Sequence, residues 1–459
     1  MSNKKSISWL VQNFLFNSYP RRAKSLIRES DKWSDEQIKT YQFTQLKNLI
    51  EYAYNNVPFY NNSFRQAAFR PELFKSIEDI NRIPLLSKDD VRKNLDSLIS
   101  RKFPKEYLLE DTSGGTTGLP VTFYADKRVF SPVEYVYITS LWNRIGYNFY
   151  DRYVVFRGEI IGNGNNGEKK YWYHNRMRNC IVFSAFEMND DVIPHYIRKI
   201  KEFKPKFLHC YPSVLYTFAN YLMNNKVNDL PPLKGIFLGS ETLYSWQREL
   251  FQKVFNTRLY TWYGHRERCI LAGEQDVPAV YEVFPTYGFA ELINQRGQSC
   301  SMDGEAGEIV GTSLYNYAFP LIRYNTHDIA EYCTQKTSYR NFMRIKNIKG
   351  RIQDFFIDKS GSMITITTSW NAIKAVKDKI SAHQFVQDIP GKLTLNIEAV
   401  KEINREEIAT VKNDFRERFP NFDLDVNVVK SIQRTALGKF RYFVQNLDIE
   451  FNRYSKEVV

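Results

Sequence analysis

The chain has 459 residues, which is enough for two or three domains and a large hydrophobic core. Its 43% hydrophobic and 25% charged residues are typical of a soluble globular protein, and no internal repeat or low-complexity segment is evident. The net charge of +13 favours an anionic partner, such as a nucleotide, coenzyme A, a nucleic acid or an anionic membrane surface, without choosing among them.

Five cysteines are scattered along the chain without a C-x-x-C pair, which argues against a disulfide framework and a cysteine-rich zinc site. The first residues lack the apolar region of a signal peptide, and no run approaches the roughly 18 apolar residues that span a bilayer. We therefore expect reduced thiols and a soluble, cytoplasmic protein. Residues 7–26 combine aromatic and basic side chains, which is typical either of an arm packed on the body or of a helix touching a membrane surface.

Residues 1–80 predict a helical N-terminal arm. Apolar residues recur with a helical period over residues 33–64, and Pro58 ends that helix because proline disfavours helical geometry in its predecessor. Ser76 and Ser87 each precede acidic residues, which is typical of helix starts.

Residues 112–118 contain only Thr, Ser and Gly, and an apolar, aromatic run follows them. Glycine lets backbone amides approach a ligand closely, and the hydroxyl groups add donors, so this loop can form a nest for an anion. The lysine and the spacing of a P-loop are absent. A β-hairpin turn explains the same residues, because residues 121–124 predict a strand.

Helices and strands alternate over residues 130–260 and indicate βαβ units with a largely parallel sheet. The predicted order is a helix at 130–141, a strand at 153–157, two helices flanking a strand at 207–209 within 190–225, a strand at 235–239, a helix at 245–255 and a strand at 257–260. Short strands follow and predict a small barrel or a mixed sheet, at 280–285, 290–293, 307–312 and 329–333.

Beyond residue 351 the pattern changes to that of a compact α+β unit of about a hundred residues. The predicted strands are at 355–357, 363–366, 393–397 and 424–429, and the predicted helices are at 369–379 and 404–419.

Residues 112–118, named the Gly/Thr loop, belong to one of eight stretches that are distributed over nearly the whole chain. These stretches are residues 45–60 (QLKNLIEYAYNNVPFY), 76–90 (SIEDINRIPLLSKDD), 111–124 (DTSGGTTGLPVTFY), 238–243 (LGSETL), 262–267 (WYGHRE), 323–328 (RYNTHD), 350–354 (GRIQD) and 434–441 (RTALGKFR). Together they resemble the adenylate-forming superfamily of acyl-CoA synthetases, luciferases and peptide-synthetase adenylation domains. Within it, the similarity is closest to the phenylacetate–CoA ligase/CapK-like branch.

The resemblance implies an α/β fold with a large N-terminal adenylation domain, residues 1–351, built from mostly parallel sheets and a small barrel. A small α+β lid domain, residues 355–459, follows a hinge at 352–354, where Asp354 matches the hinge residue of the family. Such a lid swings between adenylation and acyl-transfer poses, with a few residues absorbing the rotation.

The resemblance also implies a nucleotide site. The loop closes over the β- and γ-phosphates, Asp328 accepts hydrogen bonds from the ribose hydroxyls with Arg351 assisting, and Tyr263 stacks near adenine. The full set is Ser113, Gly114, Gly115, Thr116, Thr117, Gly118, Gly239, Ser240, Glu241, Tyr263, Gly264, Asp328 and Arg351. Without the resemblance, these are turn, packing and surface residues.

Three residues are implied as catalytic: Lys439, Glu267 and Thr116. Lys439 bridges the substrate carboxylate and the α-phosphate, a role that suits a mobile point charge. Glu267 holds Mg²⁺, which prefers oxygen ligands, and Thr116 belongs to the phosphate loop. Taken alone, Lys439 is typical of a solvated surface lysine, and Glu267 of a glutamate paired with its neighbouring arginines.

Four departures from the family pattern stand out. Gly114 replaces a frequent second serine, Leu119 replaces a frequent lysine, and His327 replaces the usual glycine before the ribose aspartate. Residues 358–363 do not closely match the coenzyme-binding surface of the family, so coenzyme A is left open as the acceptor.

By the fold, the substrate pocket lies among residues 130–146, 208–213 and 238–263. Four aromatic residues line it and make it an apolar or aromatic acid site, or else they are ordinary core: Trp142, Tyr211, Phe237 and Trp262.

The activity implied is ATP- and Mg²⁺-dependent conversion of a carboxylic acid to an acyl-adenylate, followed by acyl transfer to a thiol (coenzyme A or a carrier protein) or to an amine. CapK-like relatives are associated with surface-polysaccharide biosynthesis, so a sugar is one expected destination. Two alternatives stay open. One is a catalytically inactive nucleotide-binding or scaffold member of the fold. The other is a nucleic-acid-binding protein, which the net positive charge favours but for which the sequence contains no recognition motif.

Overall fold

The computed structural model describes residues 18–113, 121–157, 161, 170–185, 188, 190–337, 341–351, 355–359, 363–365, 373, 375–376, 379–433 and 441–447. The chain forms two compact units, each built from two segments. The first unit combines Met1–Asn148 with Trp262–Ile348, and the second combines Phe149–Thr261 with Lys349–Val459.

Helices open the first unit, in the order α2 (Ser18–Ser30), α3 (Asp35–Asn56), α4 (Pro58–Gln66), η2 (Pro71–Leu73), η3 (Ile77–Arg82), α5 (Lys88–Lys93), η4 (Asp96–Leu98) and η5 (Lys105–Tyr107). A capping box formed by Ser34 and Gln37 starts α3. The helical region predicted over residues 33–64 is two helices, because Val57 adopts an extended conformation and Pro58 begins the next helix. The segment after Ser76 is a 3₁₀ helix.

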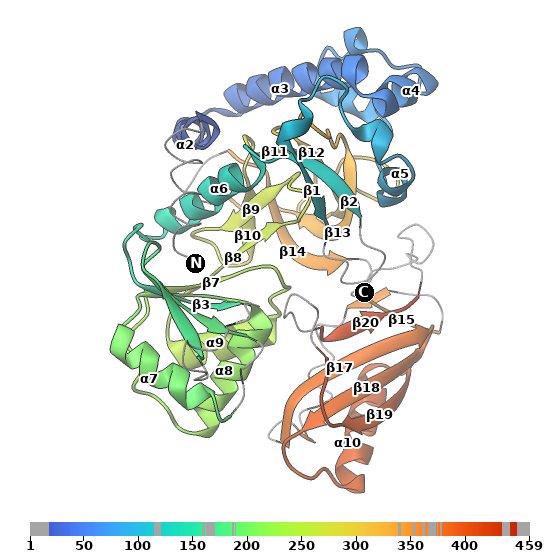
Figure 1. Cartoon of the computed structure of the whole chain (residues 1–459). Coiled ribbons are helices and arrows are strands. Elements are labelled where there is room, and N and C mark those ends of the chain that lie inside the picture. Colours follow the sequence, from blue (N-terminus) through green and yellow to red (C-terminus); the bar gives the residue numbers. More distant parts are fainter. Residues whose placement is uncertain are drawn as a thin grey trace. The chain divides into compact units, whose positions relative to one another are not determined.

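The strands of the first unit begin with a hairpin of β1 (Leu108–Thr112) and β2 (Thr122–Asp126), followed by α6 (Phe130–Arg144). The antiparallel strands that follow are β9 (Leu271–Glu274), β10 (Val280–Val283), β11 (Gly288–Ile293), β12 (Ala306–Ser313), β13 (Tyr324–Tyr332) and the first part of β14 (Arg344–Arg351). Their order is β11-β12-β13-β14-β10-β9. No pairing that closes this sheet into a barrel is found in the described part of the chain. Figure 1 shows α3 lying over β11 and β12, and residues of α3, β11 and β12 share one apolar core.

The second unit contains the predicted βαβ region. Its elements are β3 (Tyr153–Arg157), β4 (Trp172–Asn175), β5 (Cys180–Ser184), α7 (Ile193–Phe203), β6 (Phe207–Cys210), α8 (Pro212–Asn224), β7 (Gly235–Leu238), α9 (Ser245–Phe255) and the first half of β8 (Leu259–Gly264). The strand order is β8-β7-β6-β3-β5-β4, and every pair except β4–β5 is parallel. The order reverses at β3, because β5 lies on one side of it and β6 on the other.

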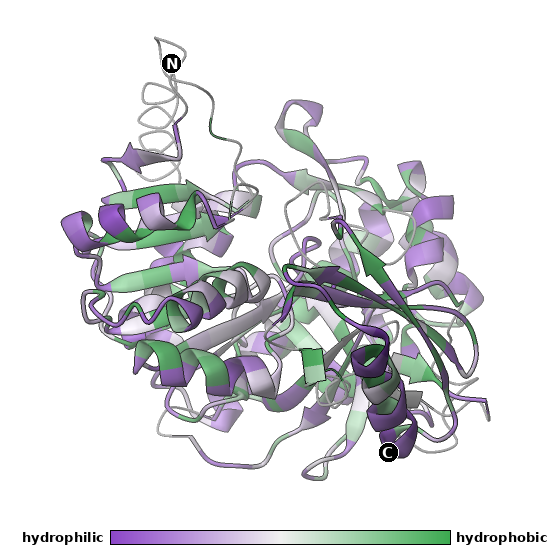
Figure 2. Cartoon of the chain, turned by 90° about the horizontal axis from the view of Figure 1, so that it is seen from below, coloured by the Kyte–Doolittle hydropathy of each residue, from purple (hydrophilic) through white to green (hydrophobic). Residues whose placement is uncertain are grey.

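The C-terminal segment of the second unit contains β15 (Phe355–Ile357), β16 (Met363–Thr365), β17 (Ile380–Ile389), β18 (Lys392–Ala399), α10 (Arg405–Arg418), β19 (Asp423–Val429) and β20 (Phe443–Gln445). A four-stranded sheet of order β19-β18-β17-β20 packs against α10 through Val411 and Phe415. Figure 2 shows hydrophobic and hydrophilic residues mixed along both strands and helices, as expected where each element buries one face and exposes another.

Among the helices that the structure describes, none combines the length and the apolar character needed to cross a bilayer.

Candidate active site

The Gly/Thr loop joins the two strands of the β1–β2 hairpin. Ser113 closes the base of the loop: its amide donates to the Val121 carbonyl, and its Oγ accepts from the Val121 amide, both at 2.9 Å. Asp111, just before the loop, accepts hydrogen bonds from Nε and Nη2 of Arg266 at 3.0 and 2.8 Å. Two of the motifs therefore meet here, although residues 114–120, with Gly114, Gly115, Thr116, Thr117 and Gly118, lie outside the described residues.

Asp328 and Tyr263 contact each other directly. The Tyr263 hydroxyl donates to Oδ2 of Asp328 at 2.7 Å, and the Asp328 amide donates to Oγ1 of Thr326 at 3.1 Å. Burial, followed by the charge of Asp328, raises the pKa of Tyr263 well above its usual value. Tyr263 therefore remains a neutral donor, and it fixes the orientation of the carboxylate predicted to bind ribose.

Glu267 is buried, and its Oε1 accepts a 2.7 Å hydrogen bond from the Tyr324 hydroxyl. Burial acts to raise the pKa of Glu267, but neighbouring His265 and the Tyr324 hydrogen bond outweigh it and leave the pKa lowered. An ionised carboxylate in a buried position is chemically suited to Mg²⁺, which commonly takes one or two protein carboxylates and completes its shell with phosphate oxygens and water. Tyr324 was not among the residues that the sequence singled out for a role.

The segment carrying Asp328 is anchored on both sides. Arg323, buried and with φ of 52°, contacts Glu291 through Nε and Nη2 at 3.0 and 2.8 Å. Lys88 Nζ donates to the Thr326 carbonyl at 2.9 Å. His327 has φ of 62°, a left-handed conformation that explains why glycine is usual at this position, and its Nδ1 lies 3.3 Å from Oε1 of Glu308.

In the second unit, side chains gather at the carboxyl ends of β3, β6 and β7. Arg157 ends β3, and its Nη2 donates to Oγ of Ser240 at 2.9 Å. The Arg157 guanidinium carbon lies 4.8 Å from the ring centroid of Tyr211, which directly follows β6. Glu241 accepts hydrogen bonds from the amide and hydroxyl of Ser213, both at 2.9 Å, so its carboxylate caps the start of α8. Ligands of parallel sheets bind where the strand order reverses, which here is beside β3.

Of the four aromatic residues predicted for the substrate pocket, two belong to each unit. In the first unit, the rings of Trp142 and Trp262 meet edge to face at 6.1 Å. In the second unit, Phe237 is fully buried and stacks on Phe207 at 5.1 Å, which is a core contact, whereas Tyr211 holds Arg157. Gly239 directly follows β7, and Gly264 ends β8.

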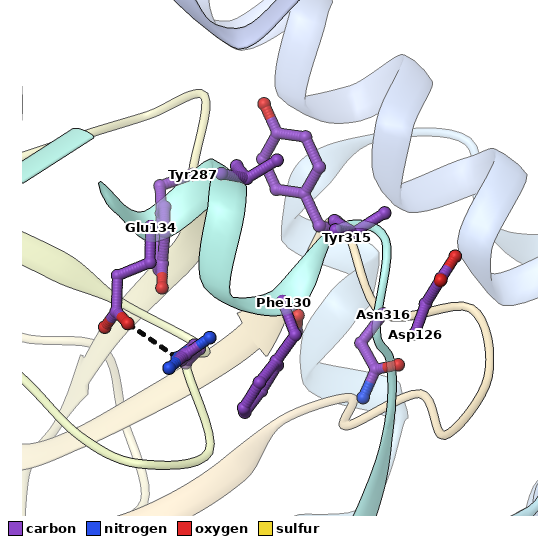
Figure 3. Close-up of a pocket in the computed structure, with 10 residues that line it drawn as sticks. Asp126, Phe130, Glu134, Tyr287, Tyr315 and Asn316 are labelled. Carbon is purple, nitrogen blue, oxygen red and sulfur yellow. Dashed lines mark ion pairs between the residues drawn. The ribbon is translucent and has the colours of Figure 1, made fainter. Parts of the chain in front are cut away.

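A pocket lies beside the first turn of α6, within the 130–146 stretch expected to border the substrate pocket, but none of the four predicted aromatic residues lines it (Figure 3). Glu134 projects into it and pairs with Nε of Arg268 at 2.7 Å, and the Arg268 guanidinium lies over the Phe130 ring. Asn316 Nδ2 donates to the carbonyls of Tyr124 and Phe319, whereas its buried Oδ1 has no hydrogen-bond partner among the described residues.

The functional residues predicted in the hinge and the lid are not described by the structure, although most of the lid itself is. Asp354 and Lys439 lie outside the described residues, and for Arg351 the structure describes only a backbone position in β14. Their roles, and the domain boundary at 352–354, remain predictions.

Comparison with known proteins decides the relationship. Residues 356–446 match the family model of the CapK C-terminal domain. Protein CapK of Staphylococcus aureus is 25% identical over 408 residues, covering 85% of this chain and 87% of CapK. Phenylacetate–coenzyme A ligase of Pseudomonas putida is 25% identical over 354 residues, covering 74% of this chain and 76% of the ligase. The chain is homologous to CapK and to phenylacetate–coenzyme A ligases.

Solved structures show the same fold. A 2-hydroxyisobutyryl-CoA ligase, crystallised in the postadenylation state with an acyl-AMP, matches over 91% of each chain with a TM-score of 0.69 and 17% identity. The predicted fold class is therefore confirmed: an α/β fold of the adenylate-forming ligases with a C-terminal domain. The motif residues Glu267, Asp328 and Tyr263 thus lie in a chain whose sequence relatives and structural neighbours include adenylate-forming ligases.

Proposed function

We propose that this protein is an ATP- and Mg²⁺-dependent ligase, which converts a carboxylic acid to an acyl-adenylate and passes the acyl group to a thiol or an amine. One observation carries the proposal. The two carboxylates expected to serve the nucleotide are each held by a tyrosine of the other motif, Asp328 by Tyr263 and Glu267 by Tyr324, both at 2.7 Å. The homology to acid–CoA ligases supports the same reaction class.

In the proposed reaction, a carboxylate oxygen of the acid attacks the α-phosphorus of ATP. The bond from that phosphorus to the bridging oxygen breaks, and pyrophosphate leaves with the bonding electron pair. Two anions must approach each other in line, so the site has to supply positive charge and fixed donors. Lys439 is proposed to supply a mobile cation, and Ser113 to Gly118 the amides and hydroxyls around the phosphates.

Mg²⁺, when bound, would neutralise charge on the ATP phosphates, and Glu267 is its proposed protein ligand. Asp328 would hold the ribose hydroxyls, oriented by Tyr263. Gly239 and Ser240 would form another wall of the nucleotide site. The carboxylate of Glu241 accepts two hydrogen bonds from Ser213. Glu241 is therefore proposed to position the start of α8 beside the nucleotide site.

The second half-reaction is proposed to follow a rotation of the C-terminal domain about Asp354. Coenzyme A, a carrier protein and an amine are the acceptor classes that remain, and structural neighbours have been crystallised with CoA as well as with an acyl-AMP. By analogy with CapK-like proteins, the acyl group would be used in surface-polysaccharide biosynthesis in the cytoplasm. Contact of residues 7–26 with a membrane surface belongs to the same proposal.

Pyrophosphate exchange tests this proposal. The full-length protein is incubated with ATP, Mg²⁺, labelled pyrophosphate and each member of a panel of carboxylic acids, alongside Lys439→Ala and Glu267→Gln. Acid-dependent exchange that both substitutions reduce by about 100-fold or more is expected. If calorimetry shows that ATP binds but no acid supports exchange, the chain is an inactive nucleotide-binding member of the fold, and the catalytic proposal fails.

A further inference from the structure

Glu267 lies in the tight turn that joins β8 to β9. The Arg268 amide donates to the His265 carbonyl at 3.0 Å, which closes the turn, and Arg268 adopts a left-handed conformation with φ of 55°. A residue with a side chain is strained in this backbone region, so the conformation persists only where surrounding contacts hold it. The side-chain contacts of Arg268 therefore bear directly on how firmly the backbone of Glu267 is placed.

The side chain of Arg268 reaches the start of α6. Its Nε lies 2.7 Å from Oε2 of Glu134, Nη1 donates to Oγ of Ser131 at 3.3 Å, and the guanidinium carbon lies 3.6 Å from the centroid of the Phe130 ring. Figure 3 shows the ion pair as a dashed line. Only 12% of the Arg268 side chain and 21% of the Glu134 side chain are exposed, so salt screens this pair less than a surface pair. The guanidinium is thus held at its edge and on its face by one helix.

The two arginines that flank Glu267 pair with other carboxylates among the described residues. Arg266 pairs with Asp111 at the end of β1, and Arg268 pairs with the glutamate of α6. The carboxylate of Glu267 instead accepts its hydrogen bond from Tyr324. The Arg266 pair is the weaker of the two anchors, because 54% of the Arg266 side chain is exposed. Tyr324 therefore orients the carboxylate of Glu267, and Arg268 anchors its backbone.

The chain beyond the turn is fixed by packing. A Cβ atom on Gly288 would overlap the carbonyl oxygen of Cys269, and one on Gly311 would lie 2.8 Å from Cβ of Cys269. β11 and β12 therefore hold Cys269 closely without any contribution from Arg268. Loss of the Arg268 contacts should loosen the turn that carries Glu267 rather than displace the neighbouring strands.

We propose that Glu134, acting through Arg268, positions Glu267 for the divalent metal ion. This inference rests on the proposed ligase function, in which Glu267 is the protein ligand of Mg²⁺. Mg²⁺ demands near-ideal coordination geometry, so a ligand on a loosened turn binds it less tightly. Residues that orient a metal ligand typically change metal affinity by about 10-fold to 100-fold, which sets the size of the expected effect. Glu134 is a positioning residue in this scheme, not a metal ligand.

Binding of Mn²⁺ tests the proposal without turnover. Mn²⁺ suits the same oxygen ligands as Mg²⁺ and is titrated into the full-length protein with a non-hydrolysable ATP analogue, while its electron paramagnetic resonance signal reports the free ion. Glu134→Gln and Arg268→Gln should each weaken Mn²⁺ binding by roughly 10-fold. Because both substitutions remove the same contact, the double variant should bind Mn²⁺ no more weakly than Arg268→Gln alone. Affinity for the analogue without metal should be unchanged.

A second double variant separates positioning from stability. Glu134→Leu combined with Arg268→Met removes both charges together and leaves no buried charge unpaired, so the urea midpoint should stay near that of the wild-type protein. Mn²⁺ binding should still weaken by roughly 10-fold, which a purely structural role would not produce. Asp31→Asn is the matched control and should leave Mn²⁺ binding unchanged. Asp31 pairs at 2.6 Å with Arg144 at the other end of α6, and Arg144 likewise lies over an aromatic ring, that of Phe284.

The outcomes distinguish this inference from the ligase proposal. Wild-type Mn²⁺ affinity in Glu134→Gln and in the apolar double variant, together with lost affinity in Glu267→Gln, would overturn the inference and leave the ligase proposal intact. A weakened affinity for the ATP analogue alone would also overturn it, because the effect would then lie at the nucleotide and not at the metal. Unchanged Mn²⁺ binding in Glu267→Gln would instead refute the metal-binding part of the proposed function.

Discussion

The hydroxyl group of Tyr263 donates a 2.7 Å hydrogen bond to Oδ2 of Asp328. A second bond runs in the opposite direction between the same two segments: the hydroxyl group of Tyr324, four residues before Asp328, donates to Oε1 of Glu267, four residues after Tyr263. Each segment thus supplies one carboxylate and the tyrosine that orients the other. The two groups proposed to hold ribose and metal are therefore fixed relative to each other by the protein itself, before any ligand is present.

Substitution of Tyr263 by Phe tests the first of these bonds. The bond orients the Asp328 carboxylate that is proposed to hold the ribose, so its loss should lower the affinity for ATP by roughly 10-fold. Loss of a hydrogen bond to a charged group also typically costs about 1.5–3 kcal/mol of folding stability, so the urea midpoint should fall as well. Calorimetric titration with ATP measures the effect, and Tyr281→Phe in β10 serves as a tyrosine control. Unchanged ATP affinity would remove Asp328 from the nucleotide site.

Substitution of Tyr324 by Phe tests the second bond through pH. The Tyr324 hydrogen bond helps to lower the pKa of Glu267, so its loss should raise that pKa. Because metal binds only the ionised carboxylate, the Mg²⁺ concentration for half-maximal exchange should rise more steeply in the variant as the pH falls below neutrality. Near pH 8, where the carboxylate is ionised in both proteins, the two curves should approach each other. A pH-independent difference would show that Tyr324 acts through packing alone.

Removal of one partner of a buried ion pair should destabilise the first unit strongly. Arg323 and Glu291 are both nearly inaccessible, and Arg323 also donates to the Ile83 carbonyl and to Oδ1 of Asn81. Glu291→Gln would leave a buried guanidinium without its counter-charge, which typically costs about 3–5 kcal/mol. Urea unfolding should show the loss, and the solvent-exposed pair of Lys201 and Asp229 supplies a control, since Asp229→Asn should change the urea midpoint little. Similar midpoints for the two variants would contradict this assignment.

Local sequence patterns predicted the helices and strands whose own residues carry a complete periodic pattern. The boundaries of β3 and α9 are those expected, because a buried β-branched run and a helical period are complete within each segment. In contrast, β20 is only three residues long and depends on parallel pairing with β17, where Phe443 faces Phe385. Such an element follows from pairing rather than from local periodicity, so the sequence did not predict it. The hairpin of β1 and β2, in contrast, was one of the two interpretations of residues 112–124.

The residues of the candidate site also divide into those that the sequence indicated and those that only the structure reveals. Glu267 and Asp328 could be singled out because their motifs carry a recognisable chemical pattern. Their partners could not, since Tyr324 lies 57 residues from Glu267 in the chain and its role arises only when β13 brings it to the carboxylate. Arg157 is an ordinary strand-end residue until the strand order shows that β3 is where the sheet reverses.

Acid should destabilise the C-terminal sheet through His383, which lies on β17 with its ring near those of Phe385 and Tyr442. Burial lowers the pKa of His383 from 6.5 to about 3. Below pH 6.5 the His383 imidazole therefore binds a proton in the unfolded chain but not in the folded chain, so the free energy of unfolding falls as the pH drops toward 3. Between pH 7 and pH 5 this histidine should account for about 2 kcal/mol of lost stability. His383→Phe keeps an aromatic ring and should flatten that part of the pH dependence, measured by urea midpoints at both pH values, whereas His195→Gln should not. If wild-type and His383→Phe lose equal stability on acidification, His383 is not the group that takes up the proton on unfolding.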